Sequence, residues 1–153
     1  MAELSTITRT SAAIALGQKV NPTNQNRVRV AVFEMPSTYA APANGDTFAT
    51  GIVLAKGTRL LCPVTVSGAT NAASVTLSVG LRDATTKVAV DATAIVNALA
   101  VTTAATAQVN TGTKLTGGQF YTLPQDCEIY GTWGGATPNA NVQTRVEISY
   151  VAP

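Results

Sequence analysis

Alternation of apolar and polar residues with a period of two recurs in short segments of this chain and constrains its fold more than any other feature. The clearest case is residues 74–82, where the apolar face consists of Val75, Leu77, Val79 and Leu81. Such alternation is typical of a β-strand with one buried face. Similar segments, separated by Gly, Pro and Asn, occupy residues 27–33, 48–55, 59–66, 119–123, 127–133 and 141–151.

The other face of residues 74–82 carries only small groups, namely Ser74, Thr76, Ser78 and Gly80. Small residues on a strand allow a second backbone to approach closely. We therefore expect another layer of the fold, or another subunit, to pack against this face.

The first alternating segment, residues 27–33, carries two arginines on one face. Like charges two residues apart usually mark a solvated face, and arginine also forms planar, bidentate hydrogen bonds with carboxylates. Arg27 and Arg29 are therefore expected on the wet face and are candidate interface anchors. The two faces of the segment consist of Val28, Val30 and Val32, and of Arg27, Arg29, Ala31 and Phe33.

Two stretches of the chain repeat a similar order of strand, turn and strand. The first turn lies at Lys56 and Gly57, where glycine supplies a positive φ, and the second lies at residues 124–126. The first stretch predicts either a hairpin or a strand that turns a corner. Two similar corners favour a two-sheet arrangement.

Residues 91–101 are the one stretch with helical spacing, because Ile95 and Leu99 lie four residues apart and Asp91 is suited to cap a first turn. A short helix and an irregular crossing segment remain open there. The other segments predict an all-β fold, an antiparallel β-sandwich, with a jelly roll preferred over an immunoglobulin-like topology.

The first 26 residues differ from the rest, since they lack aromatic residues and are rich in Ser, Thr, Asn and Gln. We expect residues 1–26 to form an extended N-terminal arm and residues 27–153 to form the sandwich. The arm has too few large apolar groups to fold alone, so we expect a partner to order it. Its isolated apolar anchors, and hence candidate contacts, are Leu4, Ile7, Ile14 and Leu16.

Composition limits the function classes. The chain has no histidine, the residue that general acid–base catalysis and metal sites most often use. Only 12% of its residues are charged and the net charge is +2, so nothing indicates binding to nucleic acid or to an anionic membrane. We expect no cofactor, no export signal and no membrane span, and a surface so poor in charge favours obligate assembly.

Few residues are candidates for a catalytic, redox or phosphate-binding role. Cys62 and Cys127 lie in separate strand-like segments, so we expect two buried thiols, with a bridge between them as the less favoured alternative. The Gly117–Gly118 and Gly134–Gly135 pairs are expected in loops between strands. The available carboxylates mostly lie beside turn residues, where Asp usually binds backbone amides, which favours turn chemistry over catalysis. These carboxylates are Asp46, Asp83, Asp91, Asp126 and Glu128.

Tyr130 and Trp133 lie close to Gly134 and Pro138 and have two interpretations. Aromatic residues at the end of a sandwich stack on a sugar ring or on a neighbouring protein. Packing in the core or against a subunit is the favoured alternative.

The segments RVRVAVFEM, FATGIVLAKGTRLLCPVTVSG, SVTLSVGLRD, GQFYTLPQDCEIYGTW and VQTRVEISYV, taken in this order over residues 27–151, resemble small virion proteins of tailed bacteriophages. The resemblance is strongest to capsid decoration (cement) proteins. It implies a jelly-roll or related sandwich, commonly a homotrimer, that is made in the host cytoplasm, sits on the outside of the head, binds the major capsid protein and bridges capsomers. Two alternatives remain: a carbohydrate-binding jelly roll of a phage fibre or spike, and, least favoured, an enzyme.

Overall fold

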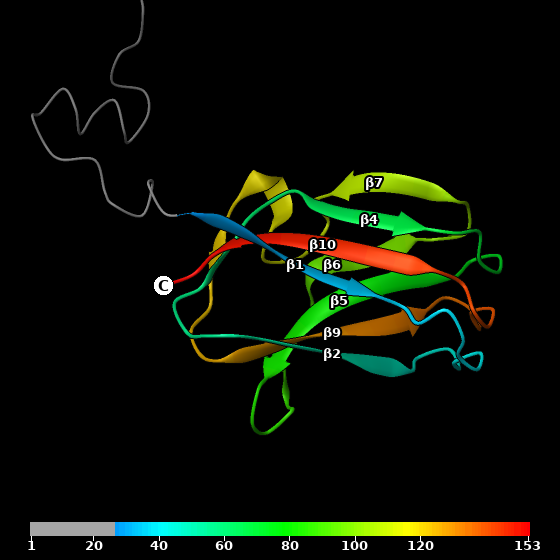
Figure 1. Cartoon of the computed structure of the whole chain (residues 1–153), viewed down its shortest axis with the longest axis horizontal. Coiled ribbons are helices and arrows are strands. Elements are labelled where there is room, and N and C mark those ends of the chain that lie inside the picture. The colour runs from blue at the N-terminus through cyan, green and yellow to red at the C-terminus, as the bar shows by residue number, and fades with distance from the viewer. Residues whose placement is uncertain (1–26) are drawn as a thin grey trace, which may run out of the picture.

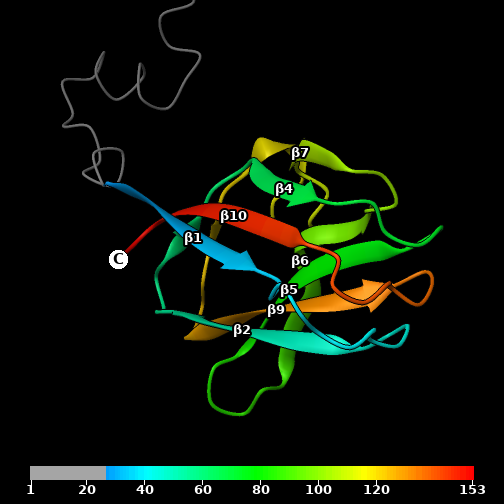
Figure 2. The same cartoon turned by 45° about the vertical axis from the view of Figure 1, so that its right-hand side comes forward.

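The computed structural model describes residues 27–153, and there the chain forms two antiparallel sheets packed face to face (Figures 1 and 2). The four candidate contacts of the arm lie outside the described residues. Sheet A contains β1 (Val28–Glu34), β3 (Arg59–Leu60), β4 (Val64–Gly68), β7 (Ala105–Val109), β8 (Tyr121–Thr122) and β10 (Thr144–Val151). Sheet B contains β2 (Thr47–Leu54), β5 (Thr76–Asp83), β6 (Ala89–Ala100) and β9 (Cys127–Gly134).

Strand β10 lies in the middle of sheet A. Glu147 is paired with Val32 of β1 and also with Thr65 of β4, so β1 and β4 flank β10 on opposite sides. Further along, β10 pairs with β3, while β8 pairs with β3 and β7 pairs with β4. Sheet A is therefore four strands wide, because β3 with β4, and β7 with β8, each occupy one position.

The strand order identifies the topology. Sheet B runs β2-β9-β5-β6, and across sheet A the order is β1, β10, β3 with β4, then β7 with β8. The chain crosses repeatedly between the sheets in the manner of two Greek keys, with β5 and β6 as neighbours in sheet B, which is the jelly-roll arrangement. The predicted all-β, jelly-roll-like sandwich is confirmed.

Both predicted corners cross from one sheet to the other, and they are joined to each other. The first leads from β2 to β3 and the second from β8 to β9. The amide of Lys56 donates to Asp126 Oδ1 over 2.7 Å, and the amide of Gly57 donates to the Leu123 carbonyl over 2.9 Å. Each corner therefore satisfies backbone groups of the other.

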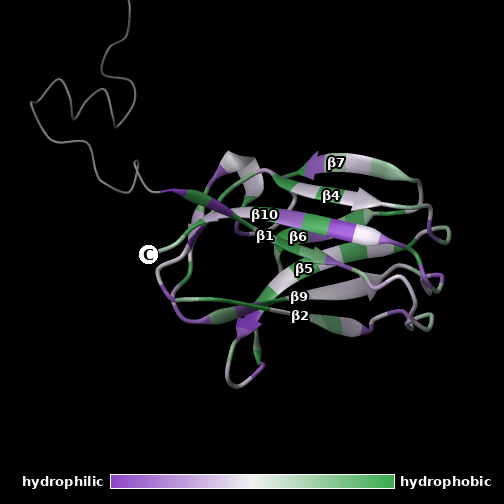
Figure 3. Cartoon of the chain, viewed as in Figure 1, coloured by the Kyte–Doolittle hydropathy of each residue, from purple (hydrophilic) through white to green (hydrophobic). Residues whose placement is uncertain are grey.

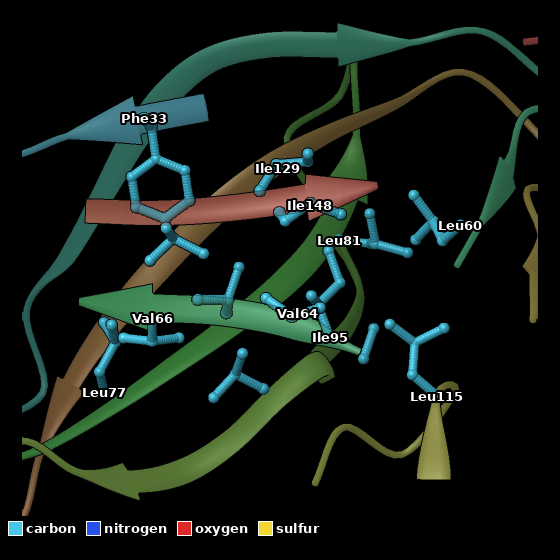
Figure 4. Close-up of a cluster of buried hydrophobic side chains, with 14 of the residues drawn as sticks. Phe33, Leu60, Val64, Val66, Leu77, Leu81, Ile95, Leu115, Ile129 and Ile148 are labelled. Carbon is cyan, nitrogen blue, oxygen red and sulfur yellow. The ribbon is translucent and has the colours of Figure 1, made fainter. Parts of the chain in front are cut away.

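The core fills the space between the sheets (Figure 4). Val64, Val66 and Ile148 of sheet A face Leu77 and Leu81 of sheet B, and these side chains are at most 3% exposed. Leu115 closes one end, just before the 3₁₀ turn η2 (Thr116–Gly118). Within residues 27–153 no helix is long and apolar enough to span a membrane.

The burial of β1 is the reverse of the expectation. Ala31 and Phe33, on the arginine face, are 7% and 8% exposed, while the valine face points outward. The reason is the aromatic cluster between the sheets: the Phe33 ring lies edge-on to Phe48 of β2, with centroids 6.0 Å apart. Phe33 therefore faces sheet B, and the valines, which alternate with it along the strand, face outward.

The stretch with helical spacing is neither a helix nor an irregular crossing but most of strand β6. Its pairing with β5 shifts register three times, so extra residues bulge out of the ladder. Ala94, Ile95 and Val96 are consequently buried in succession. The bulges break the period of two, and the apolar residues recur at a spacing that resembles a helix.

The edge strands differ in how open they are. The middle of β6 is covered by a following loop, whose Thr113 amide donates to the Thr93 carbonyl and whose Lys114 amide donates to the Ala94 carbonyl. Strand β2 is interrupted by a register shift around Gly51. By contrast, β1 pairs with β10 over all seven residues without a shift, and its other edge meets no strand of the described residues.

Candidate functional site

The arginines predicted as interface anchors lie on the surface. Arg27, just before β1, and Arg29, on β1 opposite Tyr150, are both exposed. No ion pair formed within residues 27–153 involves either guanidinium. Both are therefore accessible to the carboxylates of a partner.

The aromatic candidates do not lie on the surface. Trp133 is 1% exposed and points into the core, where its ring lies 5.6 Å from that of Phe48. Tyr130 is 6% exposed beneath the guanidinium of Arg82, 5.3 Å from the ring centroid. Neither offers a face to a sugar or a neighbour, so their interpretation as contact residues was wrong and the packing alternative holds.

Among residues 27–153 the exposed aromatic side chain is instead that of Phe120, which is 59% exposed. One side of its ring is occupied by the guanidinium of Arg59 at 4.7 Å. The glycan-binding alternative depended on Trp133, and the core position of that ring removes its support.

The outer face of sheet A carries a feature that the sequence interpretation missed. Val28 and Val30 are each 54% exposed and Val32 is 39% exposed, so they form a row along β1, here called the valine stripe. Figure 3 shows apolar colour along β1 beside the banded strand β10. The alternation had located these three residues on one face, but the buried partner Phe33 was needed to show which face is outward.

Beyond the valine stripe the same face becomes polar. Arg145 of β10 contacts Glu34 at 2.8 Å and Glu147 at 2.7 Å, and all three side chains are at least 38% exposed. An open groove of about 550 Å³ begins at this ion-pair cluster and has no aromatic lining. Its lining residues are Glu34, Ser67, Gly68, Ala69, Ala105, Thr106, Gln143, Thr144 and Arg145.

The outer face of β5 in sheet B is covered by its own chain at Ser78 and Gly80. A Cβ on Gly80 would lie 2.5 Å from the Ala92 carbonyl oxygen, because the bulged part of β6 crosses over β5 there. Ser78 Oγ accepts a hydrogen bond from the Ala98 amide. The small-residue face of β5 is therefore packed by a neighbouring strand of the same chain, and it is not available to a subunit at these residues.

Arg82, Lys87 and Glu128 form a charged cluster in sheet B. Glu128 of β9, 4% exposed, accepts hydrogen bonds from Arg82 Nε at 2.9 Å and Lys87 Nζ at 2.8 Å. These two cations lower the pKa of Glu128 from 4.5 to about 2. Both cations bind the same oxygen, Oε2, and the position of the carboxylate suits anchoring of the turn before β6.

The predicted turn chemistry is confirmed for Asp46 and Asp83, whereas Asp91 lies within strand β6 and Asp126 binds an amide of the other corner. Asp46 accepts from the Ala43 amide, Asp83 from the amides of Thr85 and Thr86, Asp91 from the Thr93 amide, and Asp126 from the Lys56 amide. No group of three or more Cys, Asp or Glu suited to hold a metal ion occurs in residues 27–153.

The cysteines and the glycine pairs lie largely where the sequence predicted them. Both thiols are free, as expected. Cys127 is fully buried, but Cys62 is only half-buried, although both thiols were predicted to be buried. Burial raises the pKa of the Cys127 thiol, with Asp83 and Asp126 adding to the effect. Gly117–Gly118 lies in the η2 turn, and Gly134–Gly135 lies where β9 ends.

Solved structures share this fold. A chain in the capsid asymmetric unit of cyanophage Pam1 matches with a TM-score of 0.57 at 18% identity, covering 84% of this chain and 86% of that chain. A chain in the capsid of Ralstonia phage GP4 matches with a TM-score of 0.62 at 17% identity, covering 83% and 85%. No protein-family model and no curated protein matches the sequence. Identities this low show the shared jelly-roll fold.

Proposed function

We propose that this protein is a structural component of a bacteriophage virion, a decoration protein that binds the outer surface of the head and stabilises the shell by bridging capsomers. The observation that carries the proposal is the match of nearly the whole chain to nearly the whole of two chains from phage capsids. Those chains are of about the same length as this one. A free-standing sandwich of this size fits a component added to a shell.

The stabilising effect needs no catalytic residue. A ligand that binds only the assembled lattice shifts the equilibrium toward the assembled state, just as a ligand of the native state opposes unfolding. A homotrimer, which we include in the proposal, multiplies the effect because several weak contacts act together.

The contacts to the major capsid protein are assigned to the arm and to the start of β1. Residues 1–26 serve as a separate docking arm, with Leu4, Ile7, Ile14 and Leu16 as apolar anchors. Arg27 and Arg29 are exposed where the arm joins the sandwich, and they supply charged contacts. The sandwich of residues 27–153 then remains outside the shell.

Binding to empty shells tests the proposal. Purified protein is mixed with phage heads that lack their small outer proteins, and in parallel with a glycan array. We expect co-sedimentation with the heads, saturation at a fixed ratio to the major capsid protein, and a higher melting temperature of the shell. Retention on a glycan with no binding to heads would replace the decoration role by a fibre or spike role.

A further inference from the structure

We propose that the valine stripe of β1 is the surface through which copies of this chain contact each other. The inference deepens the proposed function, since it rests on the proposed self-association and names the surface that produces it. The small-residue face of β5, which the sequence favoured for this purpose, is covered by β6 at Gly80 and Ser78.

The stripe has the geometry of a contact surface. It lies on an edge strand, so a neighbour reaches it without being blocked by a further strand of residues 27–153. The seven residues of β1 pair with β10 without a register shift, so the three valines are spaced regularly, about 7 Å apart. Regular apolar rows on exposed edges are rare on monomers, because they promote association.

The other exposed valines do not form such a row. Val53 stands alone on β2, with an exposed fraction of 54% that equals those of Val28 and Val30. Val88 lies just before β6 and Val90 is its second residue, so these two do not extend into a longer row. Within residues 27–153 the valine stripe is thus the longest exposed row of large apolar side chains on a single strand.

The charges around the stripe favour a second copy as its partner. Residues on a symmetry axis meet the same residues of the other copies, so a charged group there would face its own like charge, and uncharged residues are favoured at that position. The stripe is uncharged, and Glu34, the next outward residue of β1, is paired with Arg145 at 2.8 Å. Arg29 belongs to the opposite face of the strand.

A common axis along β1 lets each valine meet the same valine of the other copies. The arm ends at residue 26 and β1 begins at Val28, so such packing also gathers the attachment points of the arms at one end of the axis. Arms that leave from one point engage neighbouring sites of a lattice together, which multiplies their individual affinities.

Lysine substitution tests the stripe. Val30→Lys places a charge at the centre of the proposed contact, and Val53→Lys places the same charge at an equally exposed valine of sheet B. We expect light scattering at micromolar concentration to give the wild type and V53K a multiple of the 15.7 kDa chain mass, and V30K the mass of one chain. Far-ultraviolet circular dichroism establishes that both variants keep the fold.

Cysteine substitution provides a readout that does not disturb folding. On mild oxidation, Val30→Cys is expected to give covalent dimers between copies, whereas Val53→Cys is expected to give none. An unchanged oligomer in V30K together with no dimer from V30C would overturn the stripe as the contact and leave the decoration proposal intact. A monomeric wild type would overturn both the stripe and the proposed trimer, while a dimer that V30K dissociates would support the stripe and correct the subunit number.

Discussion

Glu128 is the residue whose charge depends most on its surroundings. It is buried against Arg82 and Lys87, and their hydrogen bonds hold its pKa near 2, below the ordinary 4.5. A carboxyl whose folded-state pKa is depressed stabilises the fold fully above its unfolded-state pKa, and this contribution is lost as the pH falls toward the folded-state value.

We therefore predict that the melting temperature falls between about pH 4.5 and pH 2 and that Glu128 contributes to this fall. Glu128→Gln removes the charge but keeps the volume, so it should lower the stability by about 1–3 kcal/mol at neutral pH and flatten the acid limb. Calorimetry over pH 2–7 measures both effects. If the melting temperature of E128Q fell just as steeply between pH 4.5 and pH 2, the fall would be due to other carboxyl groups.

Cys127 gives a second prediction at this scale. It is fully buried and free, so Cys127→Ala should cost about 1 kcal/mol through lost packing. A reducing agent should leave the melting temperature of the wild type unchanged. A fall of many degrees on reduction would reveal a disulfide.

At the scale of elements, sequence alternation located strands well and failed where a strand departs from the regular ladder. Strand β10 alternates cleanly and was predicted as a strand, whereas the bulges of β6 produced a helical spacing. Alternation also separates two faces without saying which one is inward. For β1 that depended on Phe33 meeting Phe48, a contact between residues of different sheets that no local pattern encodes.

The pairing of β2 with β9 depends on a glycine beneath an aromatic ring. Phe48 is paired with Gly131, and a Cβ on Gly131 would lie 2.0 Å from the ring. Gly131→Ala should therefore destabilise the fold by about 1–3 kcal/mol through overpacking. Gly68→Ala is the control, because its nearest neighbour would be 3.7 Å away, and chemical denaturation compares the two. Equal stability of both variants would show that the ring moves aside freely.

At the scale of the whole molecule, the sequence predicted the architecture because a two-sheet sandwich can be recognised from local signals, namely alternating segments and the turn residues between them. The candidate contacts were harder to predict, since exposure depends on the assembled sandwich. Arg27 and Arg29 are exposed, but Trp133 is in the core, and the valine stripe emerged only once the inward face of β1 was known.

Deletion of residues 1–20 tests the division between arm and sandwich. We predict a melting temperature within about 2 °C of the wild type, because a docking segment contributes little to a separately packed core. Occupancy on phage heads should fall strongly. Collapse of the fold would make the segment a structural part of the sandwich, and unchanged occupancy would transfer the docking role to Arg27 and Arg29.

The central position of β10 in sheet A also sets the order in which the molecule is completed during translation. β1 leaves the ribosome before any other strand of residues 27–153, yet its register joins Val28 to Val151. At about 5–20 residues per second, these two residues are synthesised on the order of ten seconds apart. Throughout that interval Phe33 and the valines of β1 lack the strand with which they pair, so the earliest strand of the sandwich is the one that waits longest for its partner.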